Sequence, residues 1–82
     1  MSREIMAFTL YSREGCHLCE DMMRELSALQ RDQAFTVHIV DIDTDPDLQA
    51  RYDRKVPVLA HGDVELTYYF LDEALFLDYL KR

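Results

Sequence analysis

The chain has two cysteines, Cys16 and Cys19, and only His17 and Leu18 separate them. A dithiol at this spacing can close into a disulfide and open again. The apolar run 5–11 predicts a strand, residues 12–15 a turn, and the pattern from Cys16 onward an amphipathic helix. At a helix N-terminus, unpaired amide groups and the helix dipole favour the thiolate, which is the nucleophile in disulfide exchange. We therefore expect Cys16 to attack a disulfide and Cys19, one turn into the helix, to resolve the mixed intermediate.

Charged neighbours of the dithiol act in opposite directions on its reactivity. His17, when protonated, would stabilise a nearby thiolate and make the disulfide more oxidising. Glu20 and Asp21 lie in the first helical turn, where they suit the helix dipole but repel a thiolate. The sequence therefore leaves both directions open for the pKa of Cys16.

Length and composition predict one small domain, residues 1–82, with 49% hydrophobic content. The formal net charge of −7 argues against nucleic acid or an acidic membrane as a partner. The first residues lack the apolar region of a signal peptide, and no run is long enough to span a bilayer. We therefore expect a cytoplasmic protein, in which a cysteine pair is catalytic, redox-sensing or metal-binding rather than a structural crosslink.

Helical and strand patterns follow the dithiol. Apolar residues recur at the spacing of one helix face, at Leu18, Met22, Leu26 and Leu29. The β-branched and apolar run 35–40 predicts a second strand, in a sheet covered on both faces. Asp45 and Pro46 form an N-cap followed by a proline at the first helical position, so a short helix is expected to end near residues 53–54.

The last third of the chain predicts a hairpin and a helix. A strand over 56–60 opens through a proline, Gly62 makes a tight turn, and a strand over 64–70 returns antiparallel to it. Asp72 is the expected N-cap of a final helix that buries Leu75, Phe76, Tyr79 and Leu80. The order is β-α-β-α-β-β-α, an α/β fold whose four-stranded mixed sheet is flanked by three helices.

These features together resemble the glutaredoxin branch of the thioredoxin fold. They are the CxxC after the first strand, the Val-Pro pair that opens the third strand, the glycine turn and the terminal helix. The segment TLYSREGCHLCE at 9–20 and the segment VDID at 40–43 are similar to small bacterial glutaredoxin-like proteins in particular. The resemblance covers nearly the whole chain and implies a thiol-disulfide oxidoreductase.

The resemblance also implies how a substrate would be held. Pro57 would form a cis peptide bond and pack beside the dithiol, and Val56 would offer its backbone to an extended substrate. Arg13 and His17 flank the dithiol and complete the expected substrate-binding set. Arg13, together with Arg54 and Lys55, would meet the glutathione carboxylates. The expected substrates are a disulfide-containing protein or a glutathione mixed disulfide. A thiol reductant system, with glutathione as one candidate, would reopen the disulfide of a monomer that holds no bound cofactor and no metal.

The chain departs from this family before the last helix. Glutathione-using members usually have a Gly-Gly pair there, where this chain has Thr67, Tyr68, Tyr69 and Phe70. A bulkier loop leaves glutathione binding open and keeps a protein disulfide as the other substrate. We expect the three aromatic side chains to pack into the core, because so small a chain needs every large apolar group there.

A second class of function stays open beside the enzyme. The same fold could be a non-catalytic module whose cysteines sense redox state or bind a metal while its surface docks a partner. CxxC is half of a zinc site, although no second CxxC or spaced histidine pair completes four ligands. We expect His38 to be a hydrogen-bonded structural residue of its strand.

Overall fold

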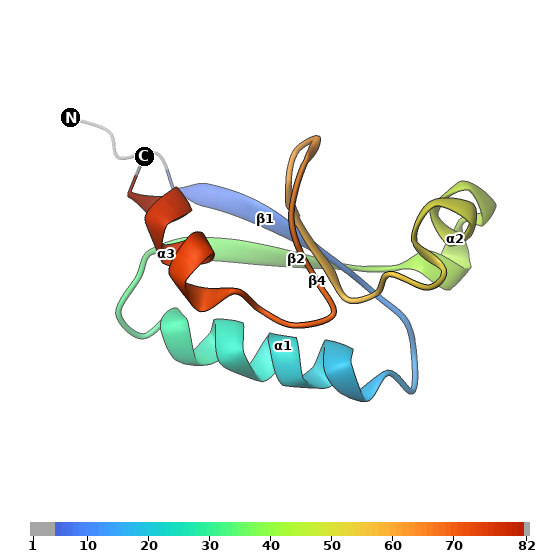
Figure 1. Ribbon diagram of the computed structural model, residues 1–82, viewed down its shortest axis with the longest axis horizontal. Coiled ribbons are helices and arrows are strands. Elements are labelled where there is room, and N and C mark those ends of the chain that lie inside the picture. The colour runs from blue at the N-terminus through green and yellow to red at the C-terminus, as the bar shows by residue number, and fades with distance from the viewer. Residues whose placement is uncertain (1–4, 82) are drawn as a thin grey trace.

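The computed structural model describes residues 5–81 and has the expected order of elements with one 3₁₀ helix added (Figure 1). Asp45 caps the second α-helix with proline at its start, and Asp72 caps the third, as the sequence predicts. The elements are β1 (Met6–Ser12), α1 (His17–Leu29), β2 (Phe35–Asp41), η1 (Ile42–Thr44), α2 (Pro46–Tyr52), β3 (Val58–His61), β4 (Val64–Tyr68) and α3 (Glu73–Leu80).

The four strands form one mixed sheet in the order β2-β1-β3-β4. β1 runs parallel to β2, whereas β3 is antiparallel to both β1 and β4. Tyr11 of β1 pairs with Val58 of β3, and Val58 pairs in turn with Tyr68 of β4. The ends of three strands therefore meet at one edge of the sheet, the edge at which β1 leads toward α1.

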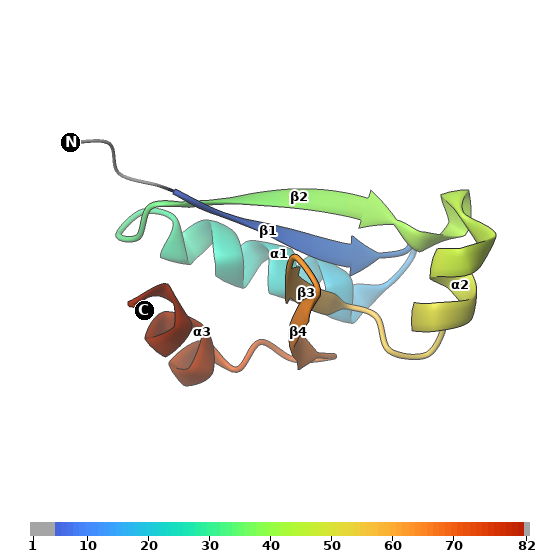
Figure 2. The same cartoon turned by 90° about the horizontal axis from the view of Figure 1, so that it is seen from above.

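Helices α1 and α3 pack on one face of the sheet, and α2 lies past its end (Figure 2). The main core contains Phe8, Leu10, Met22, Leu26, Phe35, Leu59 and Phe76, which come from β1, α1, β2, β3 and α3. A second cluster joins Ile42, Tyr52 and Val58, so η1 and α2 are fixed to the end of β3. The main cluster holds α1 through Met22 and Leu26, and the second packs against Tyr11 near the end of β1, so the two clusters hold the elements on either side of the cysteine loop.

Three expectations about burial and element length are wrong. β2 is not covered on both faces, since Thr36, His38 and Ile39 are exposed at this edge strand, and the structural hydrogen bond expected of His38 stays a prediction. β4 ends at Tyr68, two residues before the predicted end, because the chain turns sharply at Tyr69. Leu75 is exposed, and Phe76 is the buried residue of α3.

Within the described part of the chain, no helix has the length and apolar character needed to cross a membrane.

Candidate functional site: a helix-capping disulfide

Cys16 and Cys19 form a disulfide at the start of α1, with their Cα atoms 5.2 Å apart. Cys16 is the N-cap residue and has an extended backbone, while Cys19 lies in the first turn. Gly15, just before the cap, adopts a positive φ of 76°, a conformation that glycine reaches at no steric cost. This local geometry turns the chain from β1 into the helix and brings the two sulfur atoms together.

The sulfur of Cys16 takes the place of the oxygen of an ordinary N-cap side chain. The backbone N–H of Cys19 donates to Cys16 Sγ at 3.1 Å, and the N–H of Glu20 donates to the Cys16 carbonyl at the same distance. A hydrogen bond to sulfur from a free amide at a helix N-terminus stabilises negative charge on that sulfur. The geometry thus suits a thiolate on Cys16 once the disulfide opens.

The two sulfur atoms differ in their access to solvent. Cys19 is 1% exposed and is part of the buried interior, whereas Cys16 is partly exposed. A partner molecule can therefore reach Cys16 but not Cys19. This asymmetry is the arrangement that an attacking and a resolving cysteine require.

A hollow of about 480 Å³ lies directly beside the disulfide. Its lining contains both cysteines and the acidic residues Glu14, Glu20 and Asp41, with Arg13 as the basic one. Ser12, the last residue of β1, is the buried polar residue of the lining. Three carboxylates against one guanidinium give this hollow a negative charge at neutral pH.

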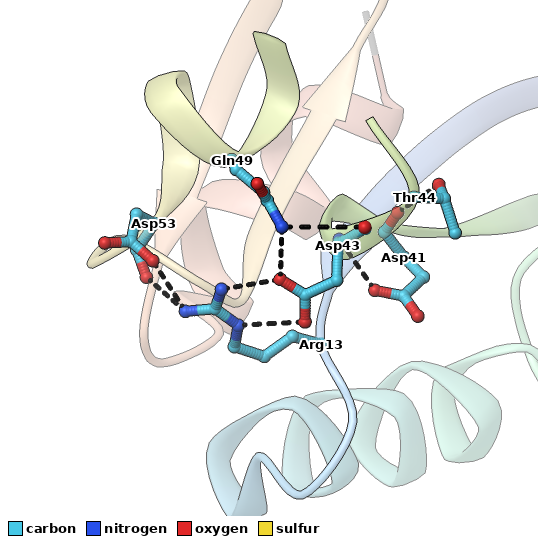
Figure 3. A network of polar contacts seen from close by, with 6 residues as sticks. All are labelled: Arg13, Asp41, Asp43, Thr44, Gln49 and Asp53. Carbon is cyan, nitrogen blue, oxygen red and sulfur yellow. Dashed lines mark hydrogen bonds and ion pairs between the residues drawn. The ribbon is translucent and has the colours of Figure 1, made fainter. Parts of the chain in front are cut away.

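Arg13 is held by two carboxylates from distant parts of the chain (Figure 3). Its guanidinium donates to Asp43 at 2.7 and 3.3 Å and to the Asp53 carboxylate at 2.8 Å. Gln49 donates to the same Asp43 at 3.0 Å. The Arg13 hydrogen bonds lower the pKa of Asp43 below its ordinary value, and the Gln49 bond adds to this effect. Arg13 thus ties the loop before α1 to η1 and to the end of α2, and its contact with a substrate stays a prediction.

His17 is the first residue of α1, and its side chain is 95% exposed. Its Nδ1 lies 3.9 Å from a carboxylate oxygen of Glu20. The ring is therefore open to solvent next to Cys16, and its contribution to substrate binding stays a prediction.

Val56 and Pro57 enter β3 at the same edge of the sheet. The peptide bond between them is cis, as the family resemblance implies. If the β1–β3 register is continued past Tyr11 and Val58, Pro57 falls opposite Ser12 and Val56 opposite Arg13. The strand register thus brings both residues to the loop that carries Cys16, and their use by a substrate stays a prediction.

Tyr69 and Phe70 form a sharp turn next to Pro57 that the sequence did not reveal. The Tyr69 N–H donates to the Pro57 carbonyl at 2.9 Å, and the Phe70 N–H donates to the Tyr68 carbonyl at 2.6 Å. The second bond closes a three-residue γ-turn around Tyr69, which has a positive φ of 65°. Tyr68, Tyr69 and Phe70 are all exposed, so the expectation that they pack into the core is wrong. One sign in the sequence marks this segment as unusual: aromatic residues stand where the family resemblance implies a Gly-Gly pair.

Among residues 5–81, no group of three histidine, cysteine, aspartate or glutamate side chains is arranged to hold a metal ion.

Comparison with known proteins adds a family and several structures. The model of the glutaredoxin-like domain (DUF836) matches residues 7–81. The solution NMR structure of protein Ne2328 from Nitrosomonas europaea is 38% identical, with a TM-score of 0.85 over 96% of this chain and 95% of that one. The X-ray structure of protein XcR50 from X. campestris is 36% identical, with a TM-score of 0.68 over 90% of this chain and 95% of that one.

A more distant structure shares only the fold. Thioredoxin 1 from Thermosipho africanus is 14% identical, with a TM-score of 0.61 over 93% of this chain and 96% of that one. No curated protein matches the chain. The comparisons support a glutaredoxin-like thioredoxin fold.

Proposed function

Because this chain belongs to the glutaredoxin-like domain family (DUF836), we propose that it is a thiol-disulfide oxidoreductase. One observation carries the proposal: a partly exposed Cys16 caps α1 and is joined by a disulfide to a buried Cys19. The chain is in the oxidised state of such an enzyme. The fold is shared with thioredoxin, and the specific activity is our inference.

In the first step of the proposed reaction, the Cys16 thiolate attacks one sulfur of a substrate disulfide. A bond forms between Cys16 and that sulfur, and the other substrate sulfur leaves as a thiolate that takes up a proton. The amide of Cys19, which donates to Cys16 Sγ in the disulfide, is placed to stabilise the attacking thiolate. His17, open to solvent beside Cys16, adds positive charge there when protonated.

In the second step, the Cys19 thiolate attacks Cys16 Sγ in the mixed disulfide. The Cys16–Cys19 disulfide forms again and the remaining substrate thiol is released. Two electrons and two protons pass from the dithiol to the substrate disulfide in total. The 5.2 Å separation of the two Cα atoms allows this closure without large backbone movement.

A thiol reductant must then restore the dithiol. Two molecules of a monothiol such as glutathione, or one external dithiol protein, supply the two electrons. We assign the disulfide of a protein or of a glutathione adduct as substrate, with Val56 and Pro57 shaping the groove and Arg13 and His17 at its sides. The protein would act as a cytoplasmic monomer with no bound cofactor.

Two serine variants test the proposal with 2-hydroxyethyl disulfide as substrate and NADPH oxidation as readout. Both a glutathione and a thioredoxin reductase system are used as electron sources. We expect Cys16→Ser to abolish turnover, because no nucleophile remains at the exposed position. Cys19→Ser is expected to form a mixed disulfide that mass spectrometry detects on Cys16.

The two variants are matched, since each removes one sulfur and leaves one. Equal reactivity of both toward the disulfide would contradict the assignment of roles. Wild-type turnover no faster than the uncatalysed rate with either electron source would favour the non-catalytic module.

A further inference from the structure

Phe70 is the most exposed of the large hydrophobic side chains that the structure describes, at 70%, and Tyr69 beside it is 43% exposed. Single exposed apolar residues are ordinary on protein surfaces. Two adjacent exposed aromatic rings at one turn are less ordinary. Aromatic side chains bury large areas and dominate the energetics of interfaces. This aromatic pair, Tyr69 and Phe70, therefore has the composition of a binding surface.

The backbone fixes the aromatic pair in its exposed position. The Tyr69 N–H bonds to the Pro57 carbonyl at 2.9 Å, and the Tyr69 hydroxyl donates to the Arg54 carbonyl at 2.6 Å. Tyr69 is therefore bonded through its backbone and its side chain to the loop that leads into β3. A tyrosine with a positive φ is strained, and such strain persists where the surrounding structure holds it, often at functional sites.

The aromatic pair lies at the same edge of the sheet as the disulfide. The β3–β4 register continues from Val58 and Tyr68 to Pro57 and Tyr69, and Pro57 in turn falls opposite Ser12 of the hollow. In both views, the turn after β4 lies near the N-terminal end of α1 (Figures 1 and 2). A segment bound at Cys16 can therefore reach these rings.

The charges around the disulfide indicate what kind of molecule fits between Cys16 and the aromatic pair. The hollow beside Cys16 is lined by Glu14, Glu20 and Asp41, and Arg13 is already bonded to two carboxylates outside it. The loop whose Arg54 carbonyl accepts from the Tyr69 hydroxyl carries the basic residues Arg54 and Lys55. The hollow attracts a cation beside the reacting sulfur and disfavours glutathione, because its two carboxylates and one ammonium leave a net negative charge and it has no large apolar side chain.

We propose that the aromatic pair docks the cysteine-bearing segment of a protein disulfide, and that this segment places a basic side chain in the acidic hollow. The proposal rests on the oxidoreductase function inferred above and names its substrate class. The rings of Tyr69 and Phe70 supply apolar contact, and Glu14 and Glu20 supply the preference for positive charge. Glutathione adducts are poor substrates by the same reasoning.

Four mixed disulfides with thionitrobenzoate test this proposal, each reacting with the reduced protein while the released coloured thiolate is followed. Two are peptides that have leucine beside the cysteine and differ only in a flanking lysine or glutamate. The third is the glutathione adduct, and the fourth is the small neutral adduct of 2-mercaptoethanol. At low salt we expect the lysine peptide to react roughly tenfold faster than the glutamate peptide. This ratio should shrink in high salt, which screens exposed charges.

Variants assign the effect to the two parts of the surface. Phe70→Ser should slow both peptides about tenfold and leave the neutral adduct unchanged, because it removes apolar contact only. Val64→Ser changes another exposed apolar residue, at the far end of the same hairpin, and is the control that should alter neither rate. The double variant Glu14→Gln, Glu20→Gln should reduce the ratio of the lysine-peptide rate to the glutamate-peptide rate. Glu25→Gln, on α1 like Glu20, should leave this ratio unchanged.

Wild-type peptide rates in Phe70→Ser would overturn the docking surface, as would a glutathione adduct that reacts as fast as the lysine peptide. Phe70→Leu keeps an apolar group and should restore most of the rate, which separates lost contact from a folding defect. Failure of the neutral adduct to react with the wild-type protein would instead refute the oxidoreductase function, and the docking proposal with it.

Discussion

Cys16 and Cys19 have different environments although only two residues separate them. One helical turn moves Cys19 from the cap into the interior, and it leaves Cys16 at the surface beside the acidic hollow. The CxxC spacing and the strand before it were enough to predict this placement. Their reactivity is a separate matter that depends on the hydrogen bond to Cys16 Sγ and on the charges of Glu14, Glu20 and His17.

Arg13 shows what the sequence did not reveal at the scale of a residue. Its position three residues before Cys16 predicted that it would lie near the dithiol. Its partners, Asp43 and Asp53, are 30 and 40 residues further along the chain. Nothing local marks such pairs, so only the folded chain shows that Arg13 holds two other segments in place.

Tyr69 gives a prediction about the backbone itself. In the left-handed region an alanine is strained and a glycine is not, so we expect Tyr69→Gly to be more stable than Tyr69→Ala by about 1 kcal/mol. Both variants lose the same phenol and its bond to Arg54, so their difference isolates the conformation. Urea unfolding followed by circular dichroism measures it.

Ala74, near the start of α3, is the control, because there glycine should be less stable than alanine. In a helix, Ala74→Gly should lower the free energy of unfolding, again by about 1 kcal/mol. If Tyr69→Ala proved as stable as Tyr69→Gly, the positive φ of residue 69 would be contradicted.

Most elements were predicted because their signals are local. The apolar run of β1, the helical period of α1 and the caps Asp45 and Asp72 each depend on a few neighbouring residues. The structure departs from the predictions at the turn after β4 and where contacts between residues far apart in the sequence determine it. β4 stops at Tyr68 because the Phe70 N–H bonds to the Tyr68 carbonyl and turns the chain, and Ile39 is exposed because β2 is an edge strand.

The contact of Arg13 with Asp43 links the loop before α1 to η1 and predicts a pH dependence. Asp43 has a pKa below its ordinary value in the folded chain, chiefly because Arg13 donates hydrogen bonds to its carboxylate. Such a group stabilises the fold above its unfolded pKa of about 3.9, and the stabilisation is lost as the pH falls through the lower folded pKa. Arg13→Gln should therefore raise the pKa of Asp43 and make the loss of stability below about pH 4 shallower.

Carboxyl NMR titration of Asp43, with unfolding measured at several pH values, checks this expectation. Arg31→Gln is a matched control, because it removes an exposed cation outside this network and should leave Asp43 unchanged. A pKa of Asp43 that did not move in Arg13→Gln would show that the guanidinium does not hold this carboxylate.

At the scale of the whole molecule, the fold brings four separate segments to one edge of the sheet. They are the loop before α1, the start of η1, the entry to β3 and the turn after β4. The family resemblance implied only that Pro57 lies beside the dithiol, and the strand register brings the other segments to the same edge. The aromatic character of the last segment distinguishes this chain from glutathione-using relatives of the same fold.

The central claim is that Cys16 and Cys19 are a reversible redox pair, and the most direct measurement is their redox equilibrium. The protein is equilibrated in glutathione buffers of graded potential, free thiols are alkylated, and mass spectrometry gives the disulfide fraction. We predict a reversible midpoint between about −120 and −270 mV, the range of thiol-disulfide oxidoreductases. A pair that stays reduced at every potential would contradict the account.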